Sequence, residues 1–362
     1  MGAGVAGLSL ALALQRRQAD CIVLERSGAD CTRGFGFLLL ASGAATLRKL
    51  GLAPELAGIG QPIEQVKLLA SSGELLAEHP LIDCWAISRR RLLASLQAPL
   101  LAGTVSYGRH VVGFDWREDH LRALRVQPHD GGVPEVIEAE LFVGADGMHS
   151  TCRQQLVSRL PHRPARVREI VACVQAPALV DQLGSSFWKV IDCQGGRAVG
   201  LVPLCDGRLV WFVQYDCDRF PSPQPWRSLA FLQELLAGFP SLVWQAIGAC
   251  ESRPYLWHPI DADPPSRLVR ANLALVGDAA HPLLPFTSQG VSTALGDAEL
   301  LAERLFAPDP AAGRAGGSAV AAALAAYERC RIPELPAYVQ AGRQLAEAFV
   351  TPGRVHGLPL VL

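Results

Sequence analysis

The sequence contains little lysine and carries almost no net charge. Only Lys49, Lys67 and Lys189 are lysines among its 33 basic residues, and 34 acidic residues bring the formal net charge at pH 7 to −1. Binding of nucleic acid requires a field of positive charge, so this composition argues against a nucleic-acid partner. The preference for arginine is typical of a GC-rich coding sequence and indicates no function.

The chain also lacks long apolar runs and cysteines at metal-binding spacings. Its longest apolar stretches, such as Leu8–Leu14 and Ala319–Ala326, are far shorter than the roughly 20 residues of a membrane-spanning helix. No leader for secretion is evident. The ten cysteines include no Cys-x-x-Cys pair and no histidine partner at a zinc-like spacing. We therefore expect a cytoplasmic protein with reduced cysteines, no transmembrane segment and no metal.

The length of 362 residues and the hydrophobic content of 50% predict a packed protein of about two domains. Residues 1–26 are expected to form a turn, a helix and a short strand that ends at Glu25. Strand-like runs between residues 165 and 260 favour an antiparallel second domain. Within it, a hairpin around Asp206 is expected to place Trp211 on the opposite face from Phe212. A buried strand at Leu273–Val276 precedes helices expected at 289–306, 318–331 and 334–349.

The first motif is the glycine pattern of Gly2, Gly4 and Gly7, with Glu25 eighteen residues after the last glycine. Glycines permit a tight turn and a close approach of backbone to a pyrophosphate, which the N-terminus of the following helix attracts. A carboxylate at the end of the second strand can accept hydrogen bonds from a ribose. Together with the helix and strand, the pattern predicts a dinucleotide site. The alternative is a glycine-rich turn with a surface glutamate.

Two further motifs contain a strand that ends in an aspartate. Val143–Arg153 carries Asp146 in a turn before a helix, and by itself it is explained by a strand–turn–helix junction capped by Ser150. In the second, Asp278 follows a buried strand, and a proline-containing loop leads to a helix that begins near Gln289. The carboxylate can accept hydrogen bonds from sugar hydroxyls, and the helix N–H groups can face an electron-rich ring atom. The alternative here is a core strand followed by a capped helix.

The order and chemistry of the three motifs resemble the FAD-dependent class A monooxygenases, the aromatic-hydroxylase type of flavoprotein, from Gly2 to about residue 345. Arg89, with Leu92 and Leu96 three and seven residues later, matches a helix start of that family. This sequence has Ser288 and Gly296 where the family commonly has glycine and glutamate. The resemblance implies that FAD is bound by Gly2, Gly4, Gly7, Glu25, Arg26, Arg33, Arg89, Asp146, Gly277, Asp278, Pro285, Gln289 and Gly290.

The resemblance implies an α/β fold in which a Rossmann-like FAD-binding domain, with its first strand largely missing, carries an inserted, mainly antiparallel β-sheet domain for the substrate. We expect the FAD-binding domain to comprise residues 1–60, 85–155 and 265–362. The substrate domain is then formed by residues 61–84 and 156–264.

The resemblance also implies an FAD-dependent monooxygenase that uses NAD(P)H and O2. It would hydroxylate or epoxidise a small aromatic or hydrophobic molecule through a flavin C4a-hydroperoxide. Trp211, Phe212 and Phe286 are the candidate substrate contacts, and each has a core role as its alternative. No catalytic side chain is assigned, and His281 is expected to be structural. The other functions that remain open are an FAD-dependent reductase or saturase that does not use O2, and an FAD-binding protein without turnover. Halogenation is disfavoured because no two tryptophans lie two residues apart.

Only Met1 precedes the glycine turn, where a central strand of about five residues belongs. Without that strand, its two neighbours would face each other across unpaired backbone groups, which is expected to cost several kcal/mol. We therefore expect that Met1 is not the natural start, or replaces an apolar strand residue, and that an upstream segment rich in Val and Ile is absent. The alternative is a genuine short form that binds FAD poorly.

Overall fold

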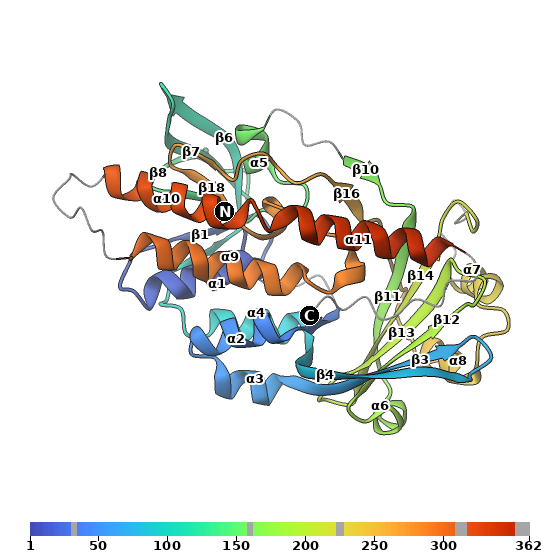
Figure 1. The fold of residues 1–362 in the computed structure, drawn as a ribbon. Helices are drawn as coiled ribbons and strands as arrows, with labels where there is room; N and C mark the ends of the chain where they lie inside the picture. The colour runs from blue at the N-terminus through green and yellow to red at the C-terminus, as the bar shows by residue number, and fades with distance from the viewer. Residues whose placement is uncertain (30–34, 158–161, 222–227, 308–316, 352–362) are drawn as a thin grey trace.

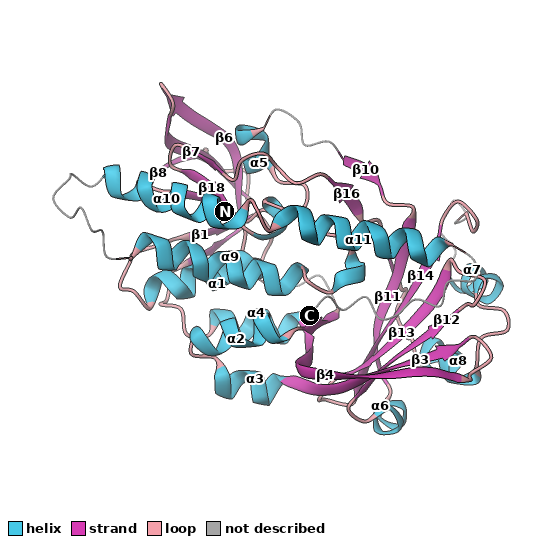
Figure 2. Cartoon of the chain, viewed as in Figure 1, coloured by secondary structure: helices cyan, strands magenta, loops and turns pink. Residues whose placement is uncertain are grey.

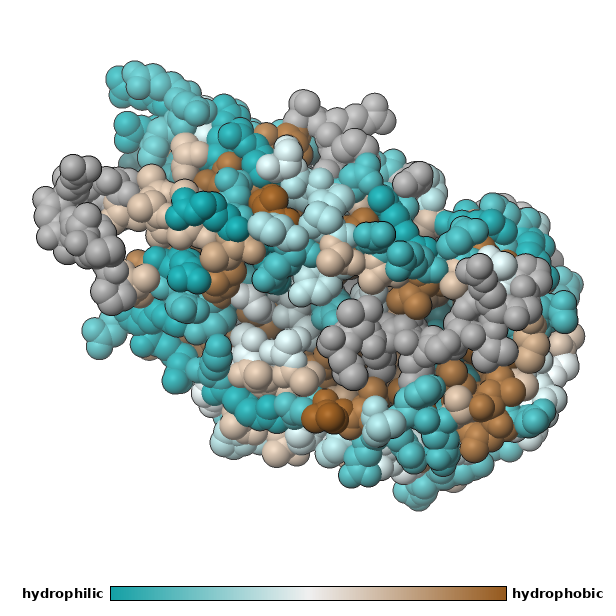
Figure 3. All heavy atoms as spheres, viewed as in Figure 1, coloured by the Kyte–Doolittle hydropathy of each residue, from teal (hydrophilic) through white to brown (hydrophobic). Residues whose placement is uncertain are grey.

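The computed structural model describes residues 1–29, 35–157, 162–221, 228–307 and 317–351. The molecule is a mixed α/β structure in which most long helices gather at one end and a curled sheet forms the other (Figures 1 and 2). On the side shown, hydrophilic residues dominate the surface and hydrophobic ones appear in small groups (Figure 3). None of the helices in the described part of the chain combines the length and apolar composition needed to cross a bilayer.

The largest element is an eight-stranded sheet. Neighbouring strands run antiparallel except for one parallel pair, β12 with β3. The predicted α/β class with a mainly antiparallel sheet is therefore confirmed. In spatial order the strands are β15 (Tyr255–Trp257), β11 (Val167–Gln175), β14 (Arg208–Asp216), β13 (Arg197–Pro203), β12 (Ser186–Ile191), β3 (Gly60–Ala70), β4 (Leu75–Ser88) and β2 (Gly36–Leu39).

Strand β14 shows how the sheet divides its two faces. Trp211 and Val213 lie in an apolar core with the helices that cover one face, whereas Phe212 and Gln214 lie on the other face. The predicted alternation along this strand is thus confirmed, because successive side chains of a strand point to opposite faces. The helices that follow or cover this sheet are α6 (Pro177–Leu183), α7 (Ser228–Leu235) and α8 (Ser241–Gly248).

The helical end is built around α1 (Val5–Gln15), which is buried from Val5 to Ala13 because nearly all of these residues are small or apolar. It packs between α4 and α9. The last helix, α11, runs from the helical end to the large sheet (Figure 1). There Phe349 belongs to the same buried cluster as Ala198 of the sheet. The other helices are α2 (Ala41–Lys49), α3 (Ala53–Ile59), α4 (Arg89–Gln97), α5 (Thr151–Leu156), α9 (Gly290–Leu305), α10 (Gly317–Arg331) and α11 (Leu335–Val350).

Four small sheets support the helical end and the connections. The strands β1 and β5 pair in parallel, as do β18 and β9, whereas the remaining small-sheet pairs are antiparallel. They comprise β1 (Val23–Glu25) with β5 (Val105–Tyr107); β17 (Val269–Arg270), β18 (Leu273–Leu275) and β9 (Phe142–Gly144); β6 (Arg109–Arg117), β7 (His120–Pro128) and β8 (Glu135–Glu138); and β10 (His162–Pro164) with β16 (Ile260–Ala262).

The first four residues form no strand, as the sequence predicts. Instead, Met1 and Gly2 lie between β1 and β9. The Gly2 N–H donates to the carbonyl oxygen of Leu24 at 2.7 Å, and the Met1 carbonyl accepts from the Ala145 N–H at 2.8 Å. These two residues therefore link the sheet of β1 and β5 to the sheet of β17, β18 and β9 at the point where the glycine turn begins.

Trp211→Ala is expected to lower the free energy of unfolding by about 3–5 kcal/mol, because it leaves a large cavity in a packed core. The side chain of Trp211 is 0% exposed. Urea unfolding of the FAD-free protein, followed by circular dichroism, measures the loss. The matched control is Phe212→Ala, which removes the half-buried ring of the next residue from the opposite face. Equal losses for the two variants would contradict the assignment of the faces.

Candidate functional site

A deep cavity of about 1180 Å³ extends from the glycine turn to the large sheet. Pockets for small molecules typically measure about 300–1,000 Å³, so this cavity is large enough for an extended cofactor together with a substrate. Its walls come from the glycine turn, the end of β1, the start of α4, the turn after β9, the segment between β18 and α9, and one face of the large sheet.

The glycine turn has no room for side chains at two of its glycines. A Cβ on Gly7 would lie 1.9 Å from the carbonyl oxygen of Gly2, and a Cβ on Gly2 would lie 2.3 Å from that of Ala145. Gly4 is the N-cap of α1 and no side chain caps this helix, so its first N–H groups have no partner within the helix. Gly4 and Val5 line the cavity. This arrangement fits a pyrophosphate group.

Glu25 holds the same turn from the end of β1. Its carboxylate accepts hydrogen bonds from the N–H groups of Ala3, at 2.8 Å, and Ser27, at 2.9 Å. Each oxygen keeps further acceptor capacity, and Glu25 and the exposed Arg26 both line the cavity. The position fits the ribose ligand that the sequence predicts.

The second motif is joined to the third by Arg153. Asp146 accepts hydrogen bonds from the Ser150 hydroxyl at 2.5 Å and the Thr151 N–H at 2.8 Å, so it anchors the start of α5 while also lining the cavity. Ser150 caps α5, as expected. The guanidinium of Arg153 donates to the carbonyl oxygens of Asp278 and Ala279 at 3.1 and 2.9 Å. The predicted strand–turn–helix junction and a cavity-lining aspartate therefore coexist.

Asp278 points into the cavity from a short 3₁₀ turn, η1 (Gly277–Ala279), that follows β18. Its side chain is open to the cavity, yet protein atoms around it raise the pKa of the carboxyl group, while His281 and Arg89 act in the opposite direction. Among the described residues, no side chain or N–H group donates a hydrogen bond to this carboxylate. It is therefore available to accept hydrogen bonds from the hydroxyls of a bound ligand.

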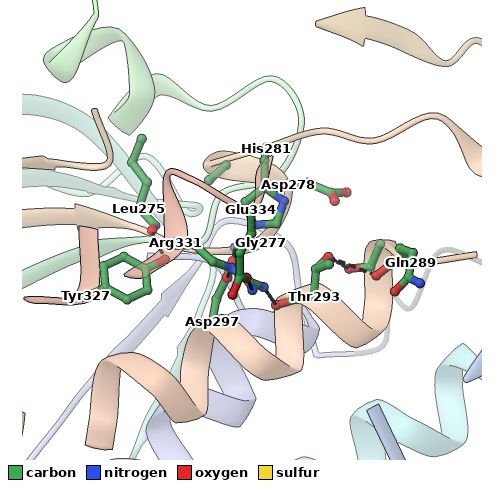
Figure 4. Close-up of polar contacts among 12 residues, drawn as sticks. Leu275, Gly277, Asp278, His281, Gln289, Thr293, Asp297, Tyr327, Arg331 and Glu334 are labelled. Carbon is green, nitrogen blue, oxygen red and sulfur yellow. Dashed lines mark hydrogen bonds and ion pairs between the residues drawn. The ribbon is translucent and has the colours of Figure 1, made fainter. Parts of the chain in front are cut away.

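The η1 turn is held from behind by Asp297 on α9. The Asp297 carboxylate accepts from the Gly277 N–H at 2.7 Å, contacts Nε2 of His281 at 2.6 Å and pairs with the guanidinium of Arg331. Burial raises the pKa of Asp297, but His281 and Arg331 outweigh it and lower that pKa below its usual value. Figure 4 shows Asp278 pointing away from this network.

His281 has a structural position in this arrangement. It is 2% exposed and does not line the cavity. This placement agrees with the expected structural role, because a general base must reach the proton that it takes from a substrate.

The segment before α9 closes the cavity near the large sheet. It forms a second 3₁₀ turn, η2 (Pro285–Thr287), in which buried Phe286 packs against Phe349 with ring centroids 5.6 Å apart. Ser288 has φ +53°, in the left-handed region that favours glycine. This conformation gives a physical reason for the glycine that is common at this position. The helix α9 begins at Gly290 without a side-chain cap, so its N-terminus is available to an electron-rich group.

The structure brings most of the predicted site residues together. Gly7 and Gly277 support the cavity walls without lining them, and Arg33 lies outside the described residues. Trp211 is a correction to the predicted substrate contacts, because it is buried in the core beneath the opposite face of the sheet. The predicted residues that line the cavity are Gly2, Gly4, Glu25, Arg26, Arg89, Asp146, Phe212, Asp278, Pro285, Phe286, Gln289 and Gly290.

Sequence patterns did not assign every polar residue of the cavity to the site, and those on the large sheet are Glu169, Lys189 and Gln214. They lie on three different strands of the large sheet. The signal available in the sequence was Lys189, one of only three lysines, placed within an apolar strand-like run.

Comparison with known proteins establishes the class of this protein. The model of a family described as "FAD binding domain" matches residues 1–341. The chain therefore belongs to this FAD-binding family, and the motifs described above are those of a flavoprotein.

Individual relatives are monooxygenases and hydroxylases. The chain is 32% identical to 3-amino-4-hydroxybenzoate 2-monooxygenase from Streptomyces cremeus, over 97% of this chain and 87% of that protein. It is 29% identical to phenazine 1,6-dicarboxylic acid hydroxylase PhzS from Lysobacter antibioticus, over 94% and 88% of the two chains. The fold matches that of Klebsiella pneumoniae HpxO complexed with FAD and uric acid, with a TM-score of 0.82, 24% identity and coverage of 96% and 87%. The protein is an oxidoreductase of the FAD-dependent monooxygenase group.

Asp297→Asn is expected to lower the free energy of unfolding by about 3–5 kcal/mol near neutral pH, because it leaves the buried guanidinium of Arg331 without its counter-charge. Glu334→Gln is the matched control, since Glu334 pairs with the same guanidinium from an exposed position and its loss should cost little. Urea unfolding measures both variants.

The difference in free energy of unfolding between the wild type and Asp297→Asn is expected to depend on pH. The pKa of Asp297 is lowered in the folded protein. Ionised Asp297 therefore contributes fully to the free energy of unfolding at every pH above the usual pKa of an unfolded aspartate. This contribution is lost as the pH falls through the lowered folded pKa. The stability difference between the wild type and Asp297→Asn should therefore shrink in acid, and a difference that grows as the pH falls would contradict the network.

Proposed function

We propose that the protein uses NAD(P)H and O2 to add one oxygen atom to an aromatic substrate, which lies between the 285–290 segment and the large sheet. The observation that carries this proposal is the continuity of the cavity. One end presents the glycine turn and Asp278, and the other end presents an apolar sheet face that includes Phe212. This continuity supports a dinucleotide cofactor and a ring-shaped substrate side by side in one space.

We propose that FAD occupies the helical end of this cavity. Gly2, Gly4 and Gly7 would receive the pyrophosphate at the N-terminus of α1, Glu25 the ribose, and Asp278 the ribityl hydroxyls. The segment from Pro285 to Gly290 would then lie beside the flavin ring. Arg26, Arg89, Asp146, Gly277 and Gln289 complete the proposed binding set. The corresponding FAD-binding domain comprises residues 1–60, 85–155 and 265–362, and residues 61–84 and 156–264 form the substrate domain.

The aromatic nature of the substrate is supported by the lining of the sheet end and by the relatives. Phe187, Val202, Val210 and Phe212 form an apolar strip on the cavity face. The names of the relatives describe a hydroxylated aminobenzoate and a phenazine dicarboxylic acid as the molecules that they act on. A planar ring would bury its faces against such a strip.

The chain's own residues bind, orient and exclude water. FAD, when bound, supplies the electron transfer and oxygen activation that amino-acid side chains do not provide. Buried Phe286, packed against Phe349, keeps solvent away from the wall of the cavity between the 285–290 segment and the sheet. The Asp297 network keeps the η1 turn rigid, so that Asp278 has its acceptor oxygens in place before a ligand binds.

Asp278→Ala is expected to weaken FAD binding about 10- to 100-fold, because ligand hydroxyls would lose a charged acceptor worth about 1.5–3 kcal/mol. Fluorescence titration of the FAD-free protein with FAD measures the dissociation constant. Asp181→Ala, an exposed aspartate on α6, is the control and should leave it unchanged. Unaltered FAD affinity in Asp278→Ala would show that this carboxylate does not hold the cofactor.

Turnover tests the reaction itself. The FAD-loaded protein should oxidise NADH or NADPH faster when a suitable aromatic compound is present, consume O2, and yield a product heavier by one oxygen atom. Oxygen electrode and mass spectrometry provide the two readouts across a panel of aromatic compounds. NAD(P)H oxidation that leaves O2 untouched would favour a reductase or saturase, and FAD binding with no reduction would favour a protein without turnover.

A further inference from the structure

Three polar side chains interrupt the apolar sheet face that lines the cavity. They are Glu169 on β11, Lys189 on β12 and Gln214 on β14. Lys189 is only 8% exposed and Gln214 only 3%. A lysine this deeply buried is rare unless its charge has a partner, and the cavity in front of it is the place where such a partner can bind.

The register of the sheet places the three side chains near one another. Glu169 and Gln214 are directly opposed across β11 and β14, and Nε2 of Gln214 donates to the Glu169 carboxylate at 3.1 Å. In the next row, Phe212 is opposite Gly200, which is itself opposite Lys189. A Cβ on Gly200 would lie 2.1 Å from the Phe212 ring. The ring therefore occupies the space over Gly200, between its own strand and Lys189.

Two of these polar groups have unused hydrogen-bonding capacity. Oε1 of Gln214 is buried and accepts no hydrogen bond from the residues that the structure describes. Within the same residues, the Lys189 ammonium makes no hydrogen bond or ion pair, and its attraction to Glu169 acts at longer range. Leaving a buried amide oxygen and a buried cation unpaired destabilises a protein, and a ligand with complementary groups would offset that cost.

Burial shifts the pKa values of Lys189 and Glu169. Burial lowers the pKa of Lys189 to about 8 and raises the pKa of Glu169 to about 7, although each group favours the charged form of the other. An anion beside Lys189 would stabilise the ammonium form. A hydroxyl or amino group beside Glu169 and Gln214 would donate to their oxygens.

We propose that Lys189, Glu169 and Gln214 form a recognition site for an aromatic acid that also carries a hydroxyl or amino group. The acid group pairs with Lys189, the ring lies against Phe212, and the hydroxyl or amino group donates to Glu169 and Gln214. The inference rests on the proposed function for the aromatic ring. The acid and donor groups follow from the three side chains themselves.

Two other cations of the cavity, Arg26 and Arg89, lie at its opposite end. Arg26 and Arg89 lie with the glycine turn and Asp278, where the proposed cofactor carries its phosphates and sugar hydroxyls. Lys189 belongs to the sheet, beyond the apolar strip. A dependence of acid binding on Lys189 therefore reports on the substrate end of the cavity.

The first test measures binding without turnover. Isothermal titration of the FAD-loaded protein, with no NAD(P)H present, compares 3-amino-4-hydroxybenzoate with its methyl ester. The acid is expected to bind at least about tenfold more tightly, as expected for a charge-assisted hydrogen bond. In Lys189→Met this preference should disappear, and in Lys189→Arg it should largely persist.

Lys67→Met is the matched control for this substitution. Lys67 lies on the neighbouring strand β3, pairs with Glu78 at 3.1 Å and does not line the cavity, so the control should keep the preference for the acid. FAD content and thermal unfolding confirm that each variant is folded. Failure of the wild type to bind the acid more tightly than the ester, or a preference that survives in Lys189→Met, overturns the proposal.

The second test addresses the donor group with a variant of nearly identical shape. Glu169→Gln should weaken binding of 3-amino-4-hydroxybenzoate about tenfold and leave binding of benzoate unchanged, because only the former has ring donors for this carboxylate. Equal effects on both ligands would remove Glu169 from the recognition site.

The outcomes also separate this inference from the proposed function. If no aromatic compound gains an oxygen atom but binding of the acid still depends on Lys189, the recognition site stands and the monooxygenase proposal fails. If oxygenation occurs and Lys189→Met leaves both the KM for the acid and its preference over the ester unchanged, the recognition site fails and the monooxygenase proposal stands.

Discussion

The buried carboxylate of Asp297 ties together the segments on which the cavity depends. Through Gly277 it fixes the end of β18, through His281 it fixes the segment that follows, and through Arg331 it fixes the C-terminal end of α10. Because the carboxylate is fully buried, loss of any one partner leaves polar groups that water cannot satisfy. The orientation of Asp278 toward the cavity therefore follows from a network on the other side of the same turn.

The glycine turn imposes a second constraint, because the helix that follows it packs against the η1 turn that Asp297 holds. A Cβ on Gly277 would lie 2.9 Å from the Cβ of Ala6, so η1 approaches α1 as closely as small residues permit. This contact sets the proposed pyrophosphate site beside the proposed ligand of the ribityl hydroxyls. At this point the cavity wall is built from backbone that packs against a methyl group, and such a wall keeps its shape better than one made of long side chains.

The local parts of this arrangement could be predicted from the sequence. The glycine turn, the strand before Asp278 and the helix after Gln289 are each encoded within a few residues. Trp211 could not be placed correctly, because the alternation of side chains along the strand separates it from Phe212 but does not show which face of the sheet helices cover. The covering helices α7 and α8 were not expected from the sequence. Glu169, Lys189 and Gln214 were missed for a similar reason, since strands distant in sequence bring them together. Non-local strand pairing is the step that sequence patterns do not resolve.

On the large sheet, one strand serves stability on one face and the proposed recognition site on the other. On β14, Trp211 fills a core in which any loss of volume is costly. Gln214 lines the cavity, and its buried Oε1 accepts no hydrogen bond from the described part of the chain. A protein can retain such an unsatisfied group only where the surrounding core holds it in place. The apolar packing beneath the sheet therefore supports the polar groups above it. Gly200 completes the arrangement, because its missing side chain leaves room for the Phe212 ring beside Lys189. The shape of the proposed substrate end thus depends on a glycine and a tryptophan that a ligand need never touch.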